Sequence, residues 1–502
     1  MATLSLAVIL AENARRRPEK TALIEGERRL TFAEVWRQAL AQAGALAGLG
    51  VAPGDRVALM APNTAEFPLA YYAVAAAGGV VVPVHLLLSP PEVEHVLRDS
   101  GATLLLVHPA QAQTGRAAAE ATGVRVVTLG EEFDKLAANA DPLPSYVTRA
   151  ADDPAVVFYT SGTTGVPKGA VLSHFNLVMN ATVNAFDAND IRPDDIALGA
   201  LPLFHAFGQT VSMNSTWRAG ATLVLLPRFD AARAIELMVA EKVNTFHGVP
   251  TMFVSLAAAA ADAPALPELR VCISGGASLP VAVLERFEAA FGARIHEGYG
   301  LSETSPTATV NQPWFGTKAG TIGHPLWGVD VEIARAETEG RIELLPPGEL
   351  GEVVIRGHNV FSGYLGRPEA TAEAVVDGWF RTGDLGTKDE EGFLRIVDRK
   401  KDVIIRGGYN VYPREVEEVL MRHPDIAQVA VIGLPDELHG EEVCAVVVPA
   451  PGASVDAAAL TEWSKEHLGR HKYPRRVEFT DALPLGPSMK VLKRELRTRY
   501  AG

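Results

Sequence analysis

Residues 155–169 read AVVFYTSGTTGVPKG, an apolar strand-like run that leads directly into a loop of small residues. After Tyr159 the segment holds four hydroxyl side chains, three glycines and one lysine, Lys168. Glycines let backbone N–H groups approach phosphate oxygens, hydroxyls donate further hydrogen bonds, and lysine adds a mobile cation. The Gly-Lys-Ser/Thr of the ordinary P-loop is absent, and a plain turn is the alternative. Because a buried strand precedes it, we interpret the segment as a phosphate-binding loop.

Alternating helix and strand patterns flank this loop through the first three hundred residues. A capping-box signature at residues 31–34 starts an amphipathic helix that continues to about Gly48. Apolar strand-like runs follow near residues 55–60, 80 and 102–107, with helical patterns between them. Strands that alternate with helices indicate parallel α/β layers.

The pattern changes after about residue 340. Residues 349–408 are dense in glycine and short β-type runs, and a shorter β/α pattern resumes at Tyr412. The charged run at residues 398–402 has few apolar anchors, so we place a domain boundary there. We therefore predict an α/β fold. Residues 1–398 form a large N-terminal domain of layered α/β subdomains plus a small β-rich element, and residues 399–502 form a small mobile α+β C-terminal domain.

The composition is that of a globular protein in a reducing compartment. The 502 residues are 48% hydrophobic and 21% charged, and the only cysteines, Cys272 and Cys444, are far apart in apolar sequence. A net charge of −14 argues against nucleic acid as a partner, because phosphate neutralisation needs a basic surface.

Residues 68–88 are apolar, but glycines and a proline interrupt them, so we predict a buried helix and strand and no transmembrane segment. Without a secretory signal pattern, the expected location is cytoplasmic.

Four further stretches follow the loop in a fixed order. They are GYGLSET (298–304), WFRTGD (379–384), DRKKD with GGYNVYP (398–402 and 407–413), and the segment 483–490. Together with the loop they resemble the motifs of the adenylate-forming superfamily, which includes acyl- and aryl-CoA synthetases, luciferases and peptide-synthetase adenylation domains. The resemblance covers essentially the whole chain. It implies ATP, Mg²⁺ and coenzyme A as cofactors or co-substrates, and a small carboxylic acid as partner; a monomer and a homodimer both stay open.

The residue types within these motifs suit a nucleotide site. Tyr299 offers a flat face for adenine, Asp384 can accept from both ribose hydroxyls, and Glu303 is an oxygen ligand suited to Mg²⁺. We predict Glu303 and Thr160 as the metal ligands. The predicted ATP and AMP contacts are Thr160, Ser161, Gly162, Thr163, Thr164, Lys168, Gly275, Gly276, Ala277, Tyr299, Gly300, Ser302, Asp384 and Arg399.

The resemblance also implies catalytic residues, namely Lys490, His205 and Glu303. Lys490 corresponds to the lysine that bridges the acyl carboxylate and the phosphate, although it also belongs to a basic tail. Met489 stands where the family normally has glycine. If that position needs a positive φ or a close backbone approach, Met489 should slow adenylation. For this reason a catalytically inactive nucleotide-binding protein stays among the hypotheses. His205 lies where the family keeps a histidine close to the ligand, and a buried structural histidine fits the sequence equally well.

The same resemblance implies domain alternation. Lys401 occupies the hinge position, and the loop of Gly407, Gly408, Tyr409 and Asn410 is the segment that a second pose presents for thioester formation.

The predicted activity is that of an AMP-forming acid–thiol ligase, specifically an acid–CoA ligase. The expected pocket stretches, residues 211–217, 246–253 and 305–310, contain no cation, and Arg218 lies just outside. An apolar acyl pocket follows, and we favour a medium- or long-chain fatty acid. An aryl acid of the coumarate kind and an acyl-AMP ligase that loads a carrier protein remain alternatives.

Overall fold

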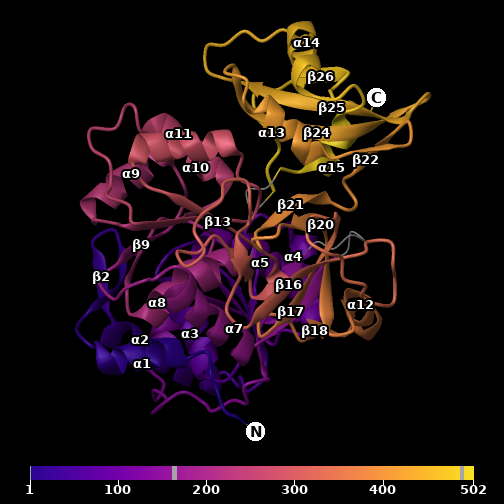
Figure 1. The fold of residues 1–502 in the computed structure, drawn as a ribbon. Helices are drawn as coiled ribbons and strands as arrows, with labels where there is room; N and C mark the ends of the chain where they lie inside the picture. The colour runs from indigo at the N-terminus through magenta and orange to yellow at the C-terminus, as the bar shows by residue number, and fades with distance from the viewer. Residues whose placement is uncertain (1, 161–166, 487–490, 502) are drawn as a thin grey trace.

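In the described part of the chain, four β-sheets and the helices that cover them make up the fold of a computed structural model (Figure 1). The structure describes residues 2–160, 167–486 and 491–501. None of the helices in these ranges is long and apolar enough to cross a membrane. Both cysteines are buried and unpaired, as predicted.

The first large sheet carries the strand that opens the glycine-rich loop. Its strands in spatial order are β18 (Gly363–Tyr364), β8 (Lys168–Ser173), β7 (Pro154–Thr160), β4 (Val80–Pro83), β3 (Arg56–Met60), β5 (Leu104–Val107) and β6 (Arg125–Thr128). The helices of this part of the chain are α2 (Phe32–Gly48), α3 (Glu66–Ala76), α4 (Pro90–Ser100), η1 (Pro109–Gln111), α5 (Ala112–Thr122), α6 (Glu131–Ala138) and α7 (His174–Val183).

The second large sheet carries the GYGLSET motif. Its strands in order are β15 (His324–Pro325), β14 (Thr307–Val310), β13 (Ile295–Gly300), β12 (Val271–Ser274), β11 (Thr245–Gly248), β9 (Ile196–Gly199), β10 (Thr222–Leu225), β1 (Thr21–Glu25) and β2 (Arg28–Thr31). The helical segments associated with it are α1 (Val8–Arg16), η2 (Asn184–Ala188), η3 (Phe207–Asn214), α8 (Ser215–Ala219), α9 (Ala231–Ala240), α10 (Pro250–Ala259), α11 (Val281–Phe291) and η4 (Ser302–Thr304).

Two smaller sheets complete the fold. The third consists of β16 (Val329–Ala334), β17 (Gly351–Gly357), β20 (Trp379–Lys388) and β19 (Val375–Val376), with β21 (Leu394–Arg399) paired to β20 and α12 (Pro368–Ala374) beside it. The fourth consists of β23 (Tyr409–Val411), β22 (Ile404–Arg406), β25 (Gly440–Pro449), β24 (Ile426–Asp436) and β26 (Arg476–Phe479), with α13 (Pro413–Leu420), α14 (Ala457–His467) and α15 (Lys493–Tyr500). In Figure 1 this last group is the yellow body at the top.

The predicted α/β fold is confirmed, with a large N-terminal domain and a small α+β C-terminal domain. The capping box at Thr31 is present, because its hydroxyl accepts from the Glu34 N–H while the Glu34 carboxylate accepts from the Thr31 N–H. Residues 68–88 form the buried α3 and β4, as expected. The boundary after residue 398 stays a prediction; β21 ends at Arg399 and β22 begins at Ile404.

The expected parallel layers form the interior of both large sheets, and antiparallel pairs, which were not predicted from the sequence, lie at their edges. The pairs β7–β8, β8–β18, β13–β14 and β14–β15 are antiparallel. The β7–β8, β13–β14 and β14–β15 pairs join strands that follow each other in the chain without the helical crossover that parallel pairing needs. In contrast, β18 pairs with β8 from a distant part of the chain. The antiparallel β7–β8 pair sets Thr160 directly opposite Lys168, so both ends of the glycine-rich loop are fixed to one sheet.

A buried asparagine joins the two large sheets. Asn63 follows β3, and its amide nitrogen donates to the carbonyls of Gly199 and Leu201 at 2.9 and 2.8 Å. Its side-chain oxygen accepts from the Leu203 N–H at 2.9 Å. This side chain therefore fixes the loop after β9, which leads to His205.

We predict that Asn63→Ala lowers the midpoint of thermal unfolding by about 5 °C or more, because three buried backbone groups lose their partners. Differential scanning calorimetry measures the change. Asn139→Ala, which removes one exposed hydrogen bond to the Lys135 carbonyl, is the control and should stay within about 1 °C. Equal midpoints for Asn63→Ala and the parent protein would contradict the role given to Asn63.

Candidate active site

A cavity of about 1600 Å³ opens where the carboxyl ends of strands from both large sheets meet the third sheet. Ligand sites in α/β folds form at such strand ends. Most of the predicted site residues line it, namely Thr160, Lys168, His205, Gly275, Gly276, Tyr299, Gly300, Ser302, Glu303, Arg399 and Lys401. Residues that are far apart in the sequence are thus brought to one place.

Other predicted residues do not line this cavity. Ala277 is exposed just beyond its rim, and the loop at residues 407–410 lies in the C-terminal domain. Asp384 is buried behind the wall and reaches the cavity through its partners. Ser161, Gly162, Thr163, Thr164, Met489 and Lys490 lie outside the described residues.

Two glycines form parts of the cavity wall where a side chain would meet neighbouring atoms. A Cβ built on Gly300 would lie 1.8 Å from the Pro306 carbonyl oxygen, so no larger residue fits there. A Cβ on Gly275 would lie 3.1 Å from the Phe207 ring. The two positions keep backbone at the cavity surface, where a ligand can approach it.

An oxygen-rich group surrounds Glu303. The hydroxyls of Thr160 and Tyr364 donate to Glu303 Oε1 at 3.3 and 3.0 Å, and the carboxylate is only 7% exposed. Burial and the nearby Glu303 carboxylate raise the pKa of the Tyr364 phenol, which therefore stays a donor. Carboxylate and hydroxyl oxygens are ligands that Mg²⁺ accepts, so Glu303 and Thr160 fit the predicted metal role. Sequence reasoning missed Tyr364.

Lys168 supplies positive charge beside this group. Its Nζ lies 5.3 Å from the centroid of the Tyr364 ring, and no ion pair joins it to a carboxylate in the described part of the chain. An ammonium group held in a cavity without a carboxylate partner is suited to bind an anion.

A second polar group centres on Asp384, which is 4% exposed. The Tyr299 phenol donates to Asp384 Oδ2 at 2.6 Å, and Arg399 Nε lies 3.2 Å from Oδ1. Burial, reinforced by the Asp384 charge, raises the pKa of Tyr299 far above its usual range. The carboxylate thus orients an aromatic ring and a guanidinium that both line the cavity.

Glu352 holds the turn that carries Asp384, and sequence reasoning did not identify it. Its carboxylate accepts from the Gly383 N–H at 3.0 Å and pairs with Arg381 at 2.6 Å, with both side chains largely buried. The available signal was a charged residue at the start of an otherwise apolar β-run. Two buried opposite charges that satisfy each other fix the conformation of residues 381–384.

The end of the cavity between η3, β12 and β14 is mainly apolar. Its walls include Phe207, Val211, Ile273 and Val310. Of the expected stretch 246–253, no residue lines the large cavity, and Val249 lines a small pocket beside His205, Phe207 and Gly276. Phe246 on β11 and Phe253 on α10 pack in the core with ring centroids 5.3 Å apart, and Phe253 contacts Phe287 of α11.

His205 lies at the start of η3 and borders the cavity. Its Nδ1 accepts from the Phe207 N–H at 3.4 Å, and its backbone N–H donates to the Pro202 carbonyl at 3.1 Å. The ring is half-buried, so the position is compatible with both the catalytic and the structural hypothesis.

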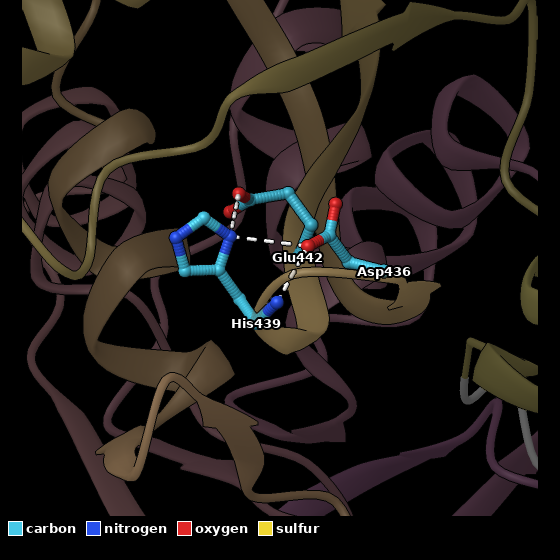
Figure 2. A group of neighbouring side chains, drawn as sticks. All are labelled: Asp436, His439 and Glu442. Carbon is cyan, nitrogen blue, oxygen red and sulfur yellow. Dashed lines mark hydrogen bonds and ion pairs between the residues drawn. The ribbon is translucent and has the colours of Figure 1, made fainter.

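Outside the cavity, Asp436, His439 and Glu442 gather at the turn between β24 and β25 (Figure 2). Their potential ligand atoms lie within 4.8 Å of one another, but Arg406 binds both oxygens of Glu442 at 2.6 and 2.9 Å. Asp436 accepts the N–H groups of Leu438 and His439 at 3.0 and 2.8 Å. The group therefore stabilises a hairpin turn.

That turn supports residues 407–410, the loop predicted to take part in thioester formation, which we call the acceptor loop. The His439 carbonyl accepts from the Gly407 N–H at 2.8 Å. Gly407 and Gly408 have φ angles of +56° and +82°, which glycine adopts without strain. The loop conformation thus depends on two glycines and on the Asp436–Glu442 turn.

Comparisons with known proteins agree with this geometry. A family model described as AMP-binding enzyme matches residues 10–365, and one described as AMP-binding enzyme C-terminal domain matches residues 415–490. The chain is 41% identical to a feruloyl-CoA synthase of Amycolatopsis over 97% of each protein. It is 37% identical to a long-chain-fatty-acid–CoA ligase of Bacillus subtilis, over 98% of this chain and 94% of that protein.

A solved structure extends the likeness to three dimensions. The anthranilate CoA ligase AuaEII in complex with anthranoyl-AMP superposes with a TM-score of 0.94 at 27% identity, over 99% of this chain and 98% of that one. The chain therefore belongs to the AMP-binding enzyme family, as an adenylate-forming acid–CoA ligase that uses ATP, Mg²⁺, coenzyme A and a carboxylic acid.

Proposed function

We propose that this ligase activates an aryl monocarboxylic acid, such as a cinnamate, and transfers the acyl group to coenzyme A. The observation that carries the choice of acid is the short, mainly apolar end of the cavity. On β12 the cavity reaches Ile273 but not Val271, and on η3 it reaches Val211 but not Met213. Val211, Val271 and Ile273 pack against one another and close this end.

The depth of this end argues for a flat, compact acyl group. The lining on β12 stops between Ile273 and Val271, two residues that are about 7 Å apart along a strand. We infer that this end suits one ring with a short linker better than an extended long alkyl chain. The fatty acid favoured from sequence is therefore the less suitable substrate, and the similarity to a feruloyl-CoA synthase and to an anthranilate ligase supports the same preference.

In the first half-reaction a carboxylate oxygen attacks the α-phosphorus of ATP, and the bond from that phosphorus to the bridging oxygen breaks. Pyrophosphate leaves and the acyl-adenylate remains. The residues of the chain act by position and charge, since the displacement needs no covalent help from the protein. Tyr299 presents its ring to the adenine, Arg399, which Asp384 holds in place, faces the ribose, and Lys168 offsets phosphate charge.

Mg²⁺, when bound, neutralises charge on the phosphates and orients them for in-line displacement. Glu303 is the residue that we assign to hold it, with Thr160 beside it. The Tyr364 hydroxyl keeps the Glu303 carboxylate in place through its 3.0 Å hydrogen bond.

In the second half-reaction the sulfur of coenzyme A attacks the acyl carbon, AMP leaves, and the thiol proton passes to solvent. We assign the acceptor loop at residues 407–410 to this step. Since it lies outside the cavity, the C-terminal domain has to rotate, and the link between β21 and β22 is the place for the rotation. Lys401 lies in this link, and its backbone N–H makes no hydrogen bond to any described group.

The first prediction concerns the acid. With free coenzyme A, kcat/KM for cinnamates should exceed that for C12–C16 fatty acids by at least about tenfold, because only the ring fits the closed end. Acid-dependent ATP–pyrophosphate exchange and thioester formation measure the two half-reactions. A preference for the long fatty acids would refute the aryl assignment, and activity only with a carrier protein would refute coenzyme A as acceptor.

The second prediction concerns Glu303. Glu303→Gln should lower kcat/KM in pyrophosphate exchange by about 100-fold or more, because the amide removes a charge next to the phosphates. Glu337→Gln, at an exposed position, is the matched control and should retain the parent rate. Unaltered exchange in Glu303→Gln would remove it from the metal role.

The third prediction concerns Lys401. Lys401→Pro should keep pyrophosphate exchange within about threefold and reduce thioester formation by about 100-fold, because proline locks φ in the link. Lys401→Ala leaves the backbone free and should lose far less of the second half-reaction. Equal losses in both half-reactions of Lys401→Pro would argue against a hinge at this position.

A further inference from the structure

A buried carboxamide belongs to the mainly apolar end of the cavity, which Ser274 and Thr307 also line. Asn184, the first residue of η2, is 2% exposed and lines the cavity. Through Asn180 its hydrogen bonds connect it to Thr307 on β14, and Val310 of that strand, Val211 and Ile273 line the same cavity. A carboxamide buried in such surroundings requires partners for its polar atoms.

The hydrogen bonds of Asn184 leave its oxygen without a donor. Its Nδ2 donates to the Asn180 carbonyl at 2.8 Å and to Asn180 Oδ1 at 3.0 Å, so both N–H bonds are used. Nothing in residues 2–160, 167–486 or 491–501 donates to Asn184 Oδ1. Asn184 Oδ1 nevertheless keeps some accessible surface, unlike the buried side-chain atoms that have no partner. Its small exposed area therefore faces the cavity.

A rigid network fixes this orientation. Asn180 is fully buried, its Nδ2 donates to the Thr307 carbonyl at 2.8 Å, and its Oδ1 accepts from the Thr307 N–H at 3.3 Å. Asn180 therefore has to present acceptors to Asn184. A flip of the Asn184 amide would place oxygen against oxygen, so the acceptor stays directed to the cavity.

We propose that Asn184 Oδ1 accepts a hydrogen bond from a hydroxyl group at the distal end of the bound acid, so that the substrate class is the phenolic aryl acids. The inference rests on the proposed aryl-CoA ligase function and adds the substituent on the ring. Walls of Val211, Ile273 and Val310 contact the ring faces and edge, and the carboxamide receives the hydroxyl.

A buried acceptor that loses its hydrogen-bond donor costs free energy when a ligand binds. An acid that ends in a methyl group or a bare ring displaces water from Asn184 Oδ1 and gives nothing in return. A phenol restores the hydrogen bond. Sites built around a hydroxyl discriminate strongly against analogues that lack it, because the polar group of the protein is left unpaired.

The first test varies the substrate and leaves the protein unchanged. With the full-length enzyme, kcat/KM for 4-hydroxycinnamate should exceed that for 4-methylcinnamate, which is similar in size, by at least about tenfold. The difference should appear in acid-dependent pyrophosphate exchange as well as in thioester formation, because binding precedes both. A ratio near one would overturn the proposal, since a retained water would then satisfy Asn184.

The second test varies the residue. Asn184→Leu should bring the ratio to one or below by reducing kcat/KM for the hydroxy acid at least about tenfold, while the methyl acid is used as well as before or better. Asn184→Ala repeats the comparison should the leucine variant not fold, and thermal unfolding checks both. Asn139→Leu is the exposed control and should keep the parent ratio. An unchanged ratio in a folded Asn184 variant would also overturn the proposal.

The aryl-CoA ligase activity and the role of Asn184 can be refuted separately. If fatty acids are activated and neither cinnamate is, the proposed function and the role of Asn184 both fall. If the two cinnamates are activated with equal kcat/KM, the aryl function stands and only the role of Asn184 falls.

Discussion

The hydrogen bonds of Asp384 join the parts of the molecule that the active site needs. This buried carboxylate accepts from Tyr299 on the second sheet and pairs with Arg399 at the end of β21. Its own turn is held by Glu352 on β17. One carboxylate thus connects the large sheet, the third sheet and the start of the link to the C-terminal domain. A negative charge so enclosed is stable only while both partners stay in place, which couples the shape of the nucleotide pocket to the position of the link.

The fold follows from local signals where these are strong. The structure confirms the capping box at Thr31, the apolar strands β3 and β5, and the buried helix in the interrupted stretch 68–88. The antiparallel edges were not foreseen, because strand direction depends on the length of the connection and on which neighbour is reached first.

The sequence predicted the site residues that belong to recognisable motifs. Tyr299, Glu303 and Arg399 line one cavity although they come from separate motifs. Tyr364, Glu352 and Asn184 were missed because their partners are distant in sequence, as with the 61 residues between Glu303 and Tyr364. No spacing rule links such pairs; they meet only when the sheets assemble. The same limit explains why Phe246 and Phe253 were assigned to the pocket, since an apolar strand looks alike on its core face and its ligand face.

One cavity is proposed to hold a nucleotide at Tyr299 and Arg399, both positioned by Asp384, and a phenolic acyl group at Asn184. A crystal structure with a stable sulfamoyl analogue of a hydroxycinnamoyl-adenylate tests this most directly. We expect adenine against the Tyr299 ring, the ribose beside Arg399, and the phenol oxygen within about 3 Å of Asn184 Oδ1. An acyl group that points away from Asn184, or a ribose that does not lie beside Arg399, would contradict the assignment.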